Sequence, residues 1–229
     1  MAKGECLKDT ILTVQAMACD AIVMRHPIEG AAKYAADIAS PVVINAGDGA
    51  HAHPTQGLLD MFTILEHGKK FKGLKMAIIG DVLYSRVARS NIAAWTKLGA
   101  DVHVAGPMTL IPHDAEALGV TVHKRVEDAI EARRGGRPAD SAGTPGKRHV
   151  PHTPGIRPDF WGKRRKNELA KPDCLVMHPG PMNRGLEISW ETGYSDQAVI
   201  REQVTNGVAV RMALLFLTLT GGKQVENAN

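Results

Sequence analysis

The chain has 229 residues, of which 44% are hydrophobic, 23% charged and only 4% aromatic. This length and composition allow a sizeable buried core and exclude fibrous, disulfide-framework and wholly disordered proteins. Three cysteines without metal-ligand spacing, and no apolar leader after Met1, predict a cytoplasmic protein. The longest apolar run, residues 212–220, is too short to cross a bilayer, so we expect no membrane partner.

The net charge of +4 comes from one segment. Residues 133–166 carry ten basic and two acidic residues, so the remainder of the chain has a net charge of −4. The segment also holds six glycines and five prolines, and shows neither strand nor helix periodicity. We interpret it as an irregular, solvated insert. The alternative is an Arg/Gly-rich nucleic-acid tail, which the lack of interleaved aromatic residues disfavours, so no nucleic-acid partner is expected.

Apolar runs and amphipathic stretches alternate along the rest of the chain. Short runs typical of buried parallel strands lie at residues 20–25, 41–45, 75–80, 101–105 and 174–177. Helical spacing of apolar residues covers residues 7–18, 30–39, 55–67, 86–98 and 199–220. This order predicts an α/β fold of two doubly wound parallel-sheet domains, the first of them truncated.

A Gly/Lys-rich turn at residues 67–73 marks the expected domain boundary. The first domain would span residues 1–67, with the C-terminal helix 199–220 packing back on it. The second would span residues 73–195 and contain the irregular segment.

The most informative stretch, Asn45–Gln56, runs from a strand end through a Gly-rich turn into a helix. Ligands in open α/β sheets bind at the carboxyl ends of strands, and helix N-termini attract anions. His53 and Gln56 can both point into such a crevice, where imidazole donates to a carbonyl oxygen and the amide binds an amino group. Alternatively, His51 and His53 are ordinary turn residues or a weak His-x-His metal pair.

Three further stretches follow predicted strands. Arg25 lies at the end of the first predicted strand, where its guanidinium can bind a phosphate or a carboxylate. Alternatively, Arg25 caps a neighbouring helix or pairs with an acidic side chain. Residues 80–90 resemble a dinucleotide loop without the G-x-G-x-x-G spacing, and Arg86 or Arg89 can instead hold a carboxylate. In residues 178–185, two prolines around Gly180 predict a rigid turn whose backbone carbonyls all point in one direction. The alternative is a turn with a purely structural role.

Three motifs in this order, Met-Arg-His-Pro, His-Pro-Thr-Gln and His-Pro-Gly-Pro-Met-Asn-Arg-Gly, resemble the catalytic chains of the aspartate carbamoyltransferase family. The resemblance covers residues 3–130 and 167–222. Ornithine carbamoyltransferases share His-Pro-x-Gln but carry His-Cys-Leu-Pro where this chain has residues 178–181. The difference favours L-aspartate over ornithine as the acceptor, with ornithine kept as an alternative.

The resemblance implies transfer of a carbamoyl group from carbamoyl phosphate to L-aspartate, giving N-carbamoyl-L-aspartate and phosphate in pyrimidine biosynthesis, without cofactor or metal. Arg25 and His53 would contact the carbamoyl oxygen. Gln56 would hold the carbamoyl amino group beside the carbonyls of Gly180 and Pro181. The family further implies that Arg86 binds aspartate, and that Lys3 reaches the active site of a neighbouring subunit in a homotrimer.

Two departures from the family pattern bear on activity. The family's Ser-Thr-Arg-Thr phosphate loop lies upstream of the Lys3 loop, where this sequence begins. Residues 133–166 stand where the family has a strand, a Leu-Arg-x-Gln aspartate-binding motif and a helix. Because each lost charge-assisted contact costs about 1.5–3 kcal/mol, we expect the isolated chain to be inactive or nearly so. A non-catalytic relative that assembles with intact subunits is the alternative.

A shifted reading frame accounts for the irregular segment. Back-translating residues 139–146 and moving one base reads RIQLERQ, which supplies the Arg-x-Gln of the missing motif. Continuing through Trp161 can give ENGMFPTLREYARIFGVNEER, an amphipathic pattern that joins the following residues naturally. One extra base near Ala132 and one lost base near Arg165 suffice.

Overall fold

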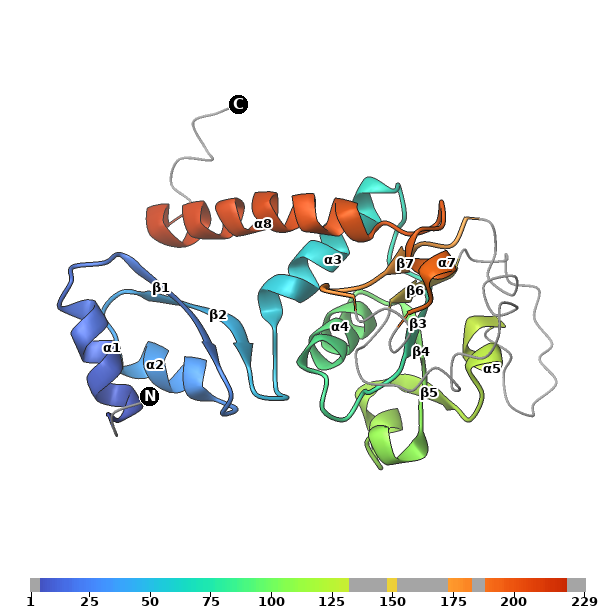
Figure 1. Ribbon diagram of the computed structural model, residues 1–229, viewed down its shortest axis with the longest axis horizontal. Helices are drawn as coiled ribbons and strands as arrows, with labels where there is room; N and C mark the ends of the chain where they lie inside the picture. Colours follow the sequence, from blue (N-terminus) through green and yellow to red (C-terminus); the bar gives the residue numbers. More distant parts are fainter. Residues whose placement is uncertain (1–4, 132–147, 152–172, 183–187, 222–229) are drawn as a thin grey trace.

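The computed structural model describes residues 5–131, 148–151, 173–182 and 188–221. Two parallel sheets lie one after the other along its longest axis (Figure 1). The smaller sheet has two strands and the larger has five. The described fold is therefore α/β with parallel sheets, as the sequence predicts.

The smaller sheet is covered by helices on one face. Its elements are α1 (Leu7–Gln15), β1 (Ala21–His26), α2 (Ala31–Ile38) and β2 (Val42–Asp48). Ile11 of α1, Ile22 of β1 and Ala35 of α2 form a small core. Val23, which follows Ile22 on the strand and so points to the opposite face, is 60% exposed.

The larger sheet has the strand order β5-β4-β3-β6-β7, all parallel. Its elements are β3 (Lys75–Ile79), α4 (Arg86–Lys97), β4 (Asp101–Ala105), 3-10 turns at Met108–Leu110 and Ala115–Leu118, β5 (Val120–His123), α5 (Val126–Glu131), β6 (Arg148–Pro151) and β7 (Val176–Met177).

The two faces of this sheet are covered by different helices. Met76 and Ile78 of β3 pack with Trp95 of α4, whereas Ala77 of the same strand packs with Val126 of α5. Figure 1 shows α4 and α5 on opposite sides of the strands. This alternation of buried side chains along one strand is what a doubly wound sheet requires.

Strand β6 corrects the expectation that residues 133–166 carry no regular structure. Residues 148–151 pair with β3 on one side and with β7 on the other. A strand inserted between two others is held by backbone hydrogen bonds on both edges, so it needs no side-chain period of its own. The rest of that segment lies outside the described residues. Strand β5, only four residues long, was also not among the predicted strands.

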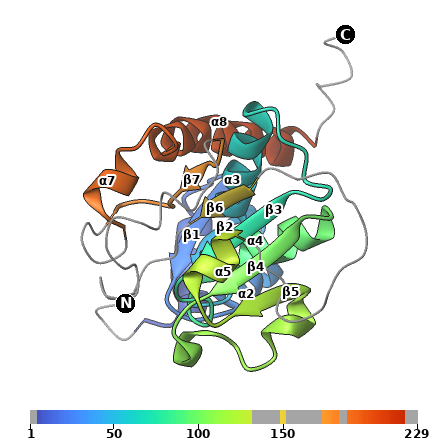
Figure 2. The ribbon, with the colours of Figure 1, turned by 90° about the vertical axis from the view of Figure 1, so that its right-hand side faces the viewer.

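Helix α3 (Pro54–Glu66) leads from the smaller sheet to the larger one, and α8 (Ile200–Thr220) packs along it, preceded by the short α7 (Trp190–Gly193). Figure 1 and Figure 2 both show α8 lying outside the strands. Asn206 of α8 donates to Thr63 Oγ1 at 3.0 Å and to Glu66 Oε2 at 2.6 Å. The C-terminal helix thus joins α3 through buried polar contacts.

Helix α8 is long and apolar enough, by length and composition alone, to cross a membrane, with a mean hydropathy of 1.2 over its best window. Its buried residues all lie in the first eight positions. The apolar side chains exposed beyond or beside them are Val204, Val208, Met212, Phe216, Leu217 and Leu219. Because polar residues of this helix bond to α3, we assign it to the packing of this fold rather than to a membrane.

A single buried carboxylate connects α3, α4 and α8. Asp60, 2% exposed, accepts hydrogen bonds from Gln56 Nε2 at 3.0 Å, Asn91 Nδ2 at 2.8 Å and Gln203 Nε2 at 2.7 Å. Burial raises the pKa of Asp60 to about 6, although the three amide donors oppose the shift. The three helices are therefore held at one point by a group with no access to water.

Asp60→Ala should destabilise the fold strongly. The change leaves three buried amide donors without their acceptor, and one unsatisfied buried donor costs about 1–3 kcal/mol. We expect the free energy of unfolding in urea to fall by about 3 kcal/mol or more. The control is Asp37→Ala on α2, whose exposed carboxylate pairs with Lys33 and should contribute less than about 1 kcal/mol. Equal losses in the two variants would contradict this role of Asp60.

Candidate active site

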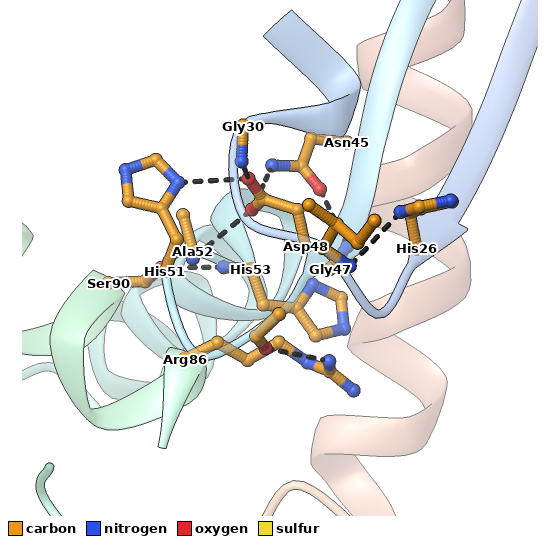
Figure 3. A network of polar contacts seen from close by, with 12 residues as sticks. His26, Gly30, Asn45, Gly47, Asp48, His51, Ala52, His53, Arg86 and Ser90 are labelled. Atoms are coloured by element: carbon orange, nitrogen blue, oxygen red, sulfur yellow. Dashed lines mark hydrogen bonds and ion pairs between the residues drawn. The ribbon is translucent and has the colours of Figure 1, made fainter. Parts of the chain in front are cut away.

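The loop after β2 is organised by Asp48 (Figure 3). Its carboxylate accepts from Asn45 Nδ2 at 2.8 Å, from the Gly30 N–H at 2.8 Å and from the Ala52 N–H at 3.2 Å. His51 Nδ1 lies 2.9 Å from Oδ2. Burial opposes ionisation of Asp48, but these hydrogen bonds outweigh it, and the pKa is lowered from its ordinary value. An ionised Asp48 thus joins the loops that follow β1 and β2.

Two glycines in this loop permit close approach. At Gly49, where φ is +48°, a Cβ would lie 2.9 Å from the Glu29 backbone nitrogen, so only glycine lets the two loops touch. At Gly47, where φ is +120°, a Cβ would lie 2.8 Å from Arg86 Nε. Arg86, the first residue of α4, donates from Nη1 to the Gly49 carbonyl at 3.1 Å. The guanidinium is therefore laid against the Gly-rich turn.

His53 stands at the N-cap of α3, where its side chain is half-buried. Its backbone N–H donates to Ser90 Oγ at 2.8 Å, which fixes the start of α3 against α4. Nδ1 lies 3.2 Å from the Thr55 hydroxyl. Burial, together with the charges of Arg86, Arg25 and Arg211, lowers the pKa of His53 to about 4. The imidazole is therefore neutral at pH 7, and Nε2 is the nitrogen left to meet a ligand.

Three guanidiniums act on this imidazole. Arg25 comes from the carboxyl end of β1, Arg86 from the start of α4 and Arg211 from the middle of α8. Within the described ranges, no carboxylate lies within ion-pair distance of any of the three. The pKa of Arg86 is itself lowered by burial and by Arg25. A neutral hydrogen-bond donor surrounded by unpaired cations suits a small anion that carries a carbonyl group.

Gln56 lies one helical turn beyond His53, but its amide nitrogen is directed to Asp60 rather than to the cations. The side chain is buried. Since Nε2 is committed to the carboxylate, the group of Gln56 left for a ligand is the carbonyl oxygen. That oxygen is an acceptor, and an acceptor is what a carbamoyl –NH₂ requires.

Gly180 and Pro181 follow β7 and are exposed. Gly180 has a φ of +65°, and its N–H donates to His178 Nδ1 at 2.9 Å. The His178 N–H in turn donates to Gln203 Oε1 at 2.9 Å, so the loop is tied to the Asp60 network. In the part of the chain that the structure describes, no hydrogen bond joins these two residues to His53.

The structure therefore places the charges of Arg25 and Arg86 near His53, whereas Gln56 and the loop that carries Gly180 and Pro181 are linked to each other through His178, Gln203 and Asp60. Lys3 lies outside the described residues. Sequence reasoning missed Arg211, because a lone arginine in an apolar-rich helix carries no local sign of facing a pocket.

The alternative of a His-x-His metal pair finds no geometric support. His51 faces Asp48, while His53 faces Thr55. Across the residues with described positions, no group of three or more His, Cys, Asp or Glu side chains is arranged to hold a metal ion.

Comparison with known proteins agrees with this geometry. Residues 1–66 match the family model of the carbamoyl-P binding domain of aspartate/ornithine carbamoyltransferases, and residues 164–218 match the Asp/Orn binding domain. The aspartate carbamoyltransferase catalytic subunits of Desulforamulus reducens and Pelotomaculum thermopropionicum are 51% and 50% identical. Each alignment covers 97% of this chain and 72% of the relative.

Solved structures give the same result. Aspartate transcarbamoylase from Trypanosoma cruzi, in complex with aspartate and phosphate, has a TM-score of 0.72 at 29% identity. Its complex with carbamoyl phosphate and aspartate has a TM-score of 0.71. In both comparisons the match covers 93% of this chain and 69% of the other.

The fold and the matched domains define a carbamoyl-transferring enzyme of the transferase class. The relatives are all named for aspartate rather than ornithine, as the residues at 178–181 led us to expect. The chain belongs to the aspartate carbamoyltransferase family, whose catalytic subunits transfer a carbamoyl group from carbamoyl phosphate to aspartate.

The low pKa of His53 can be tested by NMR titration of the imidazole resonances. We expect His53 to titrate at about pH 4 in the folded chain. In Arg25→Gln the pKa should move upward, because one of the charges that disfavours the imidazolium is gone. The matched control is Arg89→Gln, an exposed position on α4 that does not contribute to the shift. A His53 that titrates near 6.5 would contradict the described surroundings.

Proposed function

We propose that the His53 pocket binds carbamoyl phosphate and takes part in its reaction with L-aspartate, which yields N-carbamoyl-L-aspartate and phosphate for pyrimidine synthesis. The observation that carries the proposal is a neutral imidazole in the turn after β2, close enough to Arg86, Arg25 and Arg211 for their charges to act on it. The similar Trypanosoma cruzi aspartate transcarbamoylase, whose structures include complexes with carbamoyl phosphate and aspartate, supports it.

The chemistry needs no covalent intermediate. The neutral aspartate amine attacks the carbamoyl carbon, the phosphate leaves with the electron pair of the C–O bond, and the departing phosphate takes up the proton that the amine loses. Negative charge grows on the carbonyl oxygen, where Nε2–H of His53 and the Arg25 guanidinium would donate hydrogen bonds. The Gln56 oxygen would accept from the carbamoyl –NH₂, beside the Gly180 and Pro181 carbonyls, and Arg86 would hold an aspartate carboxylate. Positioning and electrostatics would supply the acceleration.

A neutral imidazole suits this role better than a charged one. Neutral imidazole donates one hydrogen bond to the oxyanion. Unlike imidazolium, it carries no second, more acidic N–H proton that the leaving phosphate or the attacking amine can remove. Burial, followed by the charges of the nearby guanidiniums, lowers the pKa of His53 and so keeps the imidazole neutral.

We further propose a cytoplasmic homotrimer in which Lys3 of one subunit enters the site of its neighbour. Support comes from the Lys-Gly-Glu-x-Leu-Lys-Asp-Thr loop at the start of the sequence, which resembles the family's intersubunit loop. Its amine would add a fourth positive charge to the three guanidiniums that act on His53.

The irregular segment sets the limit on activity. The match to the Asp/Orn binding domain begins at residue 164, just where the basic segment 133–166 ends. By the family resemblance, the segment would replace the Arg-x-Gln pair through which the family binds aspartate. We propose that this chain keeps the carbamoyl-binding residues Arg25, His53 and Gln56 but has little capacity for turnover.

Binding of carbamoyl phosphate is the direct test. We expect saturable binding of carbamoyl phosphate in isothermal titration calorimetry, and an affinity about tenfold weaker in His53→Ala, which loses a hydrogen bond to the carbamoyl oxygen. The control variant is His113→Ala, an exposed histidine outside the pocket. If the two variants bind alike, the pocket does not contact this ligand.

The coding DNA tests the origin of the irregular segment. We expect codons 139–161 to read RIQLERQ and its continuation after a one-base shift. A gene whose offset frame cannot encode that peptide contradicts the proposal. Replacing the segment with the offset-frame peptide should then strengthen L-aspartate binding by tenfold or more, as expected for a restored charge-assisted contact of about 1.5–3 kcal/mol.

A further inference from the structure

The side-chain amide of Gln56 has one of its two ends engaged. Nε2 donates to Asp60 Oδ1 at 3.0 Å, inside the contact of α3, α4 and α8. Among the described residues, no group donates to Oε1 of Gln56, and this oxygen is not one of the fully enclosed polar atoms that lack a partner. Oε1 therefore keeps access to solvent or to a ligand, although the side chain as a whole is only 6% exposed.

Gln56 belongs to the first turn of α3, which His53 begins. His53 is the N-cap and Gln56 is the third residue after it, and the Gln56 N–H donates to the His53 carbonyl at 3.1 Å. Side chains at these two positions lie next to each other at the start of a helix. The accessible amide of Gln56 is thus a neighbour of the His53 imidazole.

A carboxylate decides which end of an amide it meets. Burial raises the pKa of Asp60 to about 6, so at pH 8 the group is ionised and can only accept hydrogen bonds. Turning the Gln56 amide over would bring its oxygen against Oδ1 of Asp60, and two acceptors would then face each other in an enclosed place. Gln56 is therefore held with its nitrogen on Asp60 and its oxygen on the accessible side.

The same oxygen of Asp60 orients a second amide. Gln203 Nε2 donates to Oδ1 at 2.7 Å, which leaves Gln203 Oε1 to accept from the His178 N–H at 2.9 Å. His178 Nδ1 accepts in turn from the Gly180 N–H at 2.9 Å. The loop that, by the family resemblance, offers the Gly180 and Pro181 carbonyls is thus linked to the same carboxylate.

We propose that Asp60 is a positioning residue that sets the ligand selectivity of the site. By binding the amide nitrogen of Gln56, it presents an oxygen to the ligand, and this oxygen accepts from an amino group but gains nothing from a methyl group. The site therefore prefers carbamoyl phosphate over acetyl phosphate, which has a similar shape but a methyl group in place of the –NH₂. The inference rests on the proposed function, since it assumes that Gln56 faces the carbamoyl group.

The ratio of two affinities tests this role. In isothermal titration calorimetry at pH 8, the unaltered chain should bind carbamoyl phosphate at least about fivefold more tightly than acetyl phosphate, the effect of one hydrogen bond. Asp60→Ala should reduce this preference to less than about twofold, because the Gln56 amide can then turn over. A loss of stability alone weakens the binding of both ligands and leaves their ratio unchanged.

Two further variants separate amide orientation from helix packing. Asp60→Asn should keep the preference. In the described part of the chain, Asn91 Oδ1 is enclosed without a partner, so it can accept from the new carboxamide once the Asn91 amide turns over, and the remaining oxygen still accepts from Gln56. Thr63→Val removes the hydroxyl to which Asn206 donates and so loosens α8 on α3 without touching Asp60. Its preference should match that of the unaltered chain.

A second measurement needs no variant and decides the question if Asp60→Ala does not fold. In NMR spectra of the unaltered chain, the Gln56 N–H that is bonded to Asp60 should exchange slowly with heavy water. The Gln56 Cδ signal should move on addition of carbamoyl phosphate and stay in place on addition of acetyl phosphate. An amide that exchanges freely, or a Cδ signal that responds alike to both ligands, contradicts the proposal.

The results also distinguish this proposal from the proposed function. If Asp60→Ala keeps the preference, or if Asp60→Asn loses as much of it as Asp60→Ala does, the role of Asp60 is wrong. The proposed function then still stands, as long as His53→Ala loses affinity for carbamoyl phosphate. If the unaltered chain binds the two acyl phosphates alike, only the selectivity proposal fails. If it binds neither, both proposals fail.

Discussion

The structure depends on one buried carboxylate that three helices share. Asp60 collects amide donors from α3, α4 and α8, which lie far apart in the sequence. A charge so deeply buried is tolerated only where such donors replace water. Because Gln56 follows the His53 turn, and Gln203 also accepts from the His178 N–H, the same carboxylate links that turn to the loop after β7. Asp60 thus supports both the packing of the three helices and the positions of these two segments.

Electrostatics explains why the pocket is chemically distinctive. Arginines of β1, α4 and α8 act on His53 through their charges, and Arg25 also lowers the pKa of Arg86, so the site favours an anionic ligand. His53 responds by remaining neutral, whereas Asp48 responds to its own hydrogen bonds by remaining charged. These two residues, five positions apart, therefore have different roles. Asp48 joins the loops through its hydrogen bonds, whereas the neutral imidazole of His53 is available to bind a ligand.

The fold class and part of the site were predictable from the sequence. Apolar runs such as residues 75–80 identify buried strands because a parallel sheet leaves no polar face. Strand ends then point to Arg25, His53 and Arg86. By contrast, β6 is made by backbone pairing with distant strands, and the reach of Arg211 depends on how α8 packs on α3. Neither leaves a local pattern. The roles of Lys3, Gly180 and Pro181 stay predictions that rest on the family.

The uncovered apolar side chains of α8 and β1 bear on how the chain behaves in solution. Val23 on the small sheet and Val208 and Met212 on the helix are each more than half exposed. Surfaces of this kind attract one another, and excluded salts such as sulfate strengthen the attraction. Concentrated samples would therefore tend to self-associate, most of all during salting-out, and a dilute, low-salt buffer is the setting in which single chains persist.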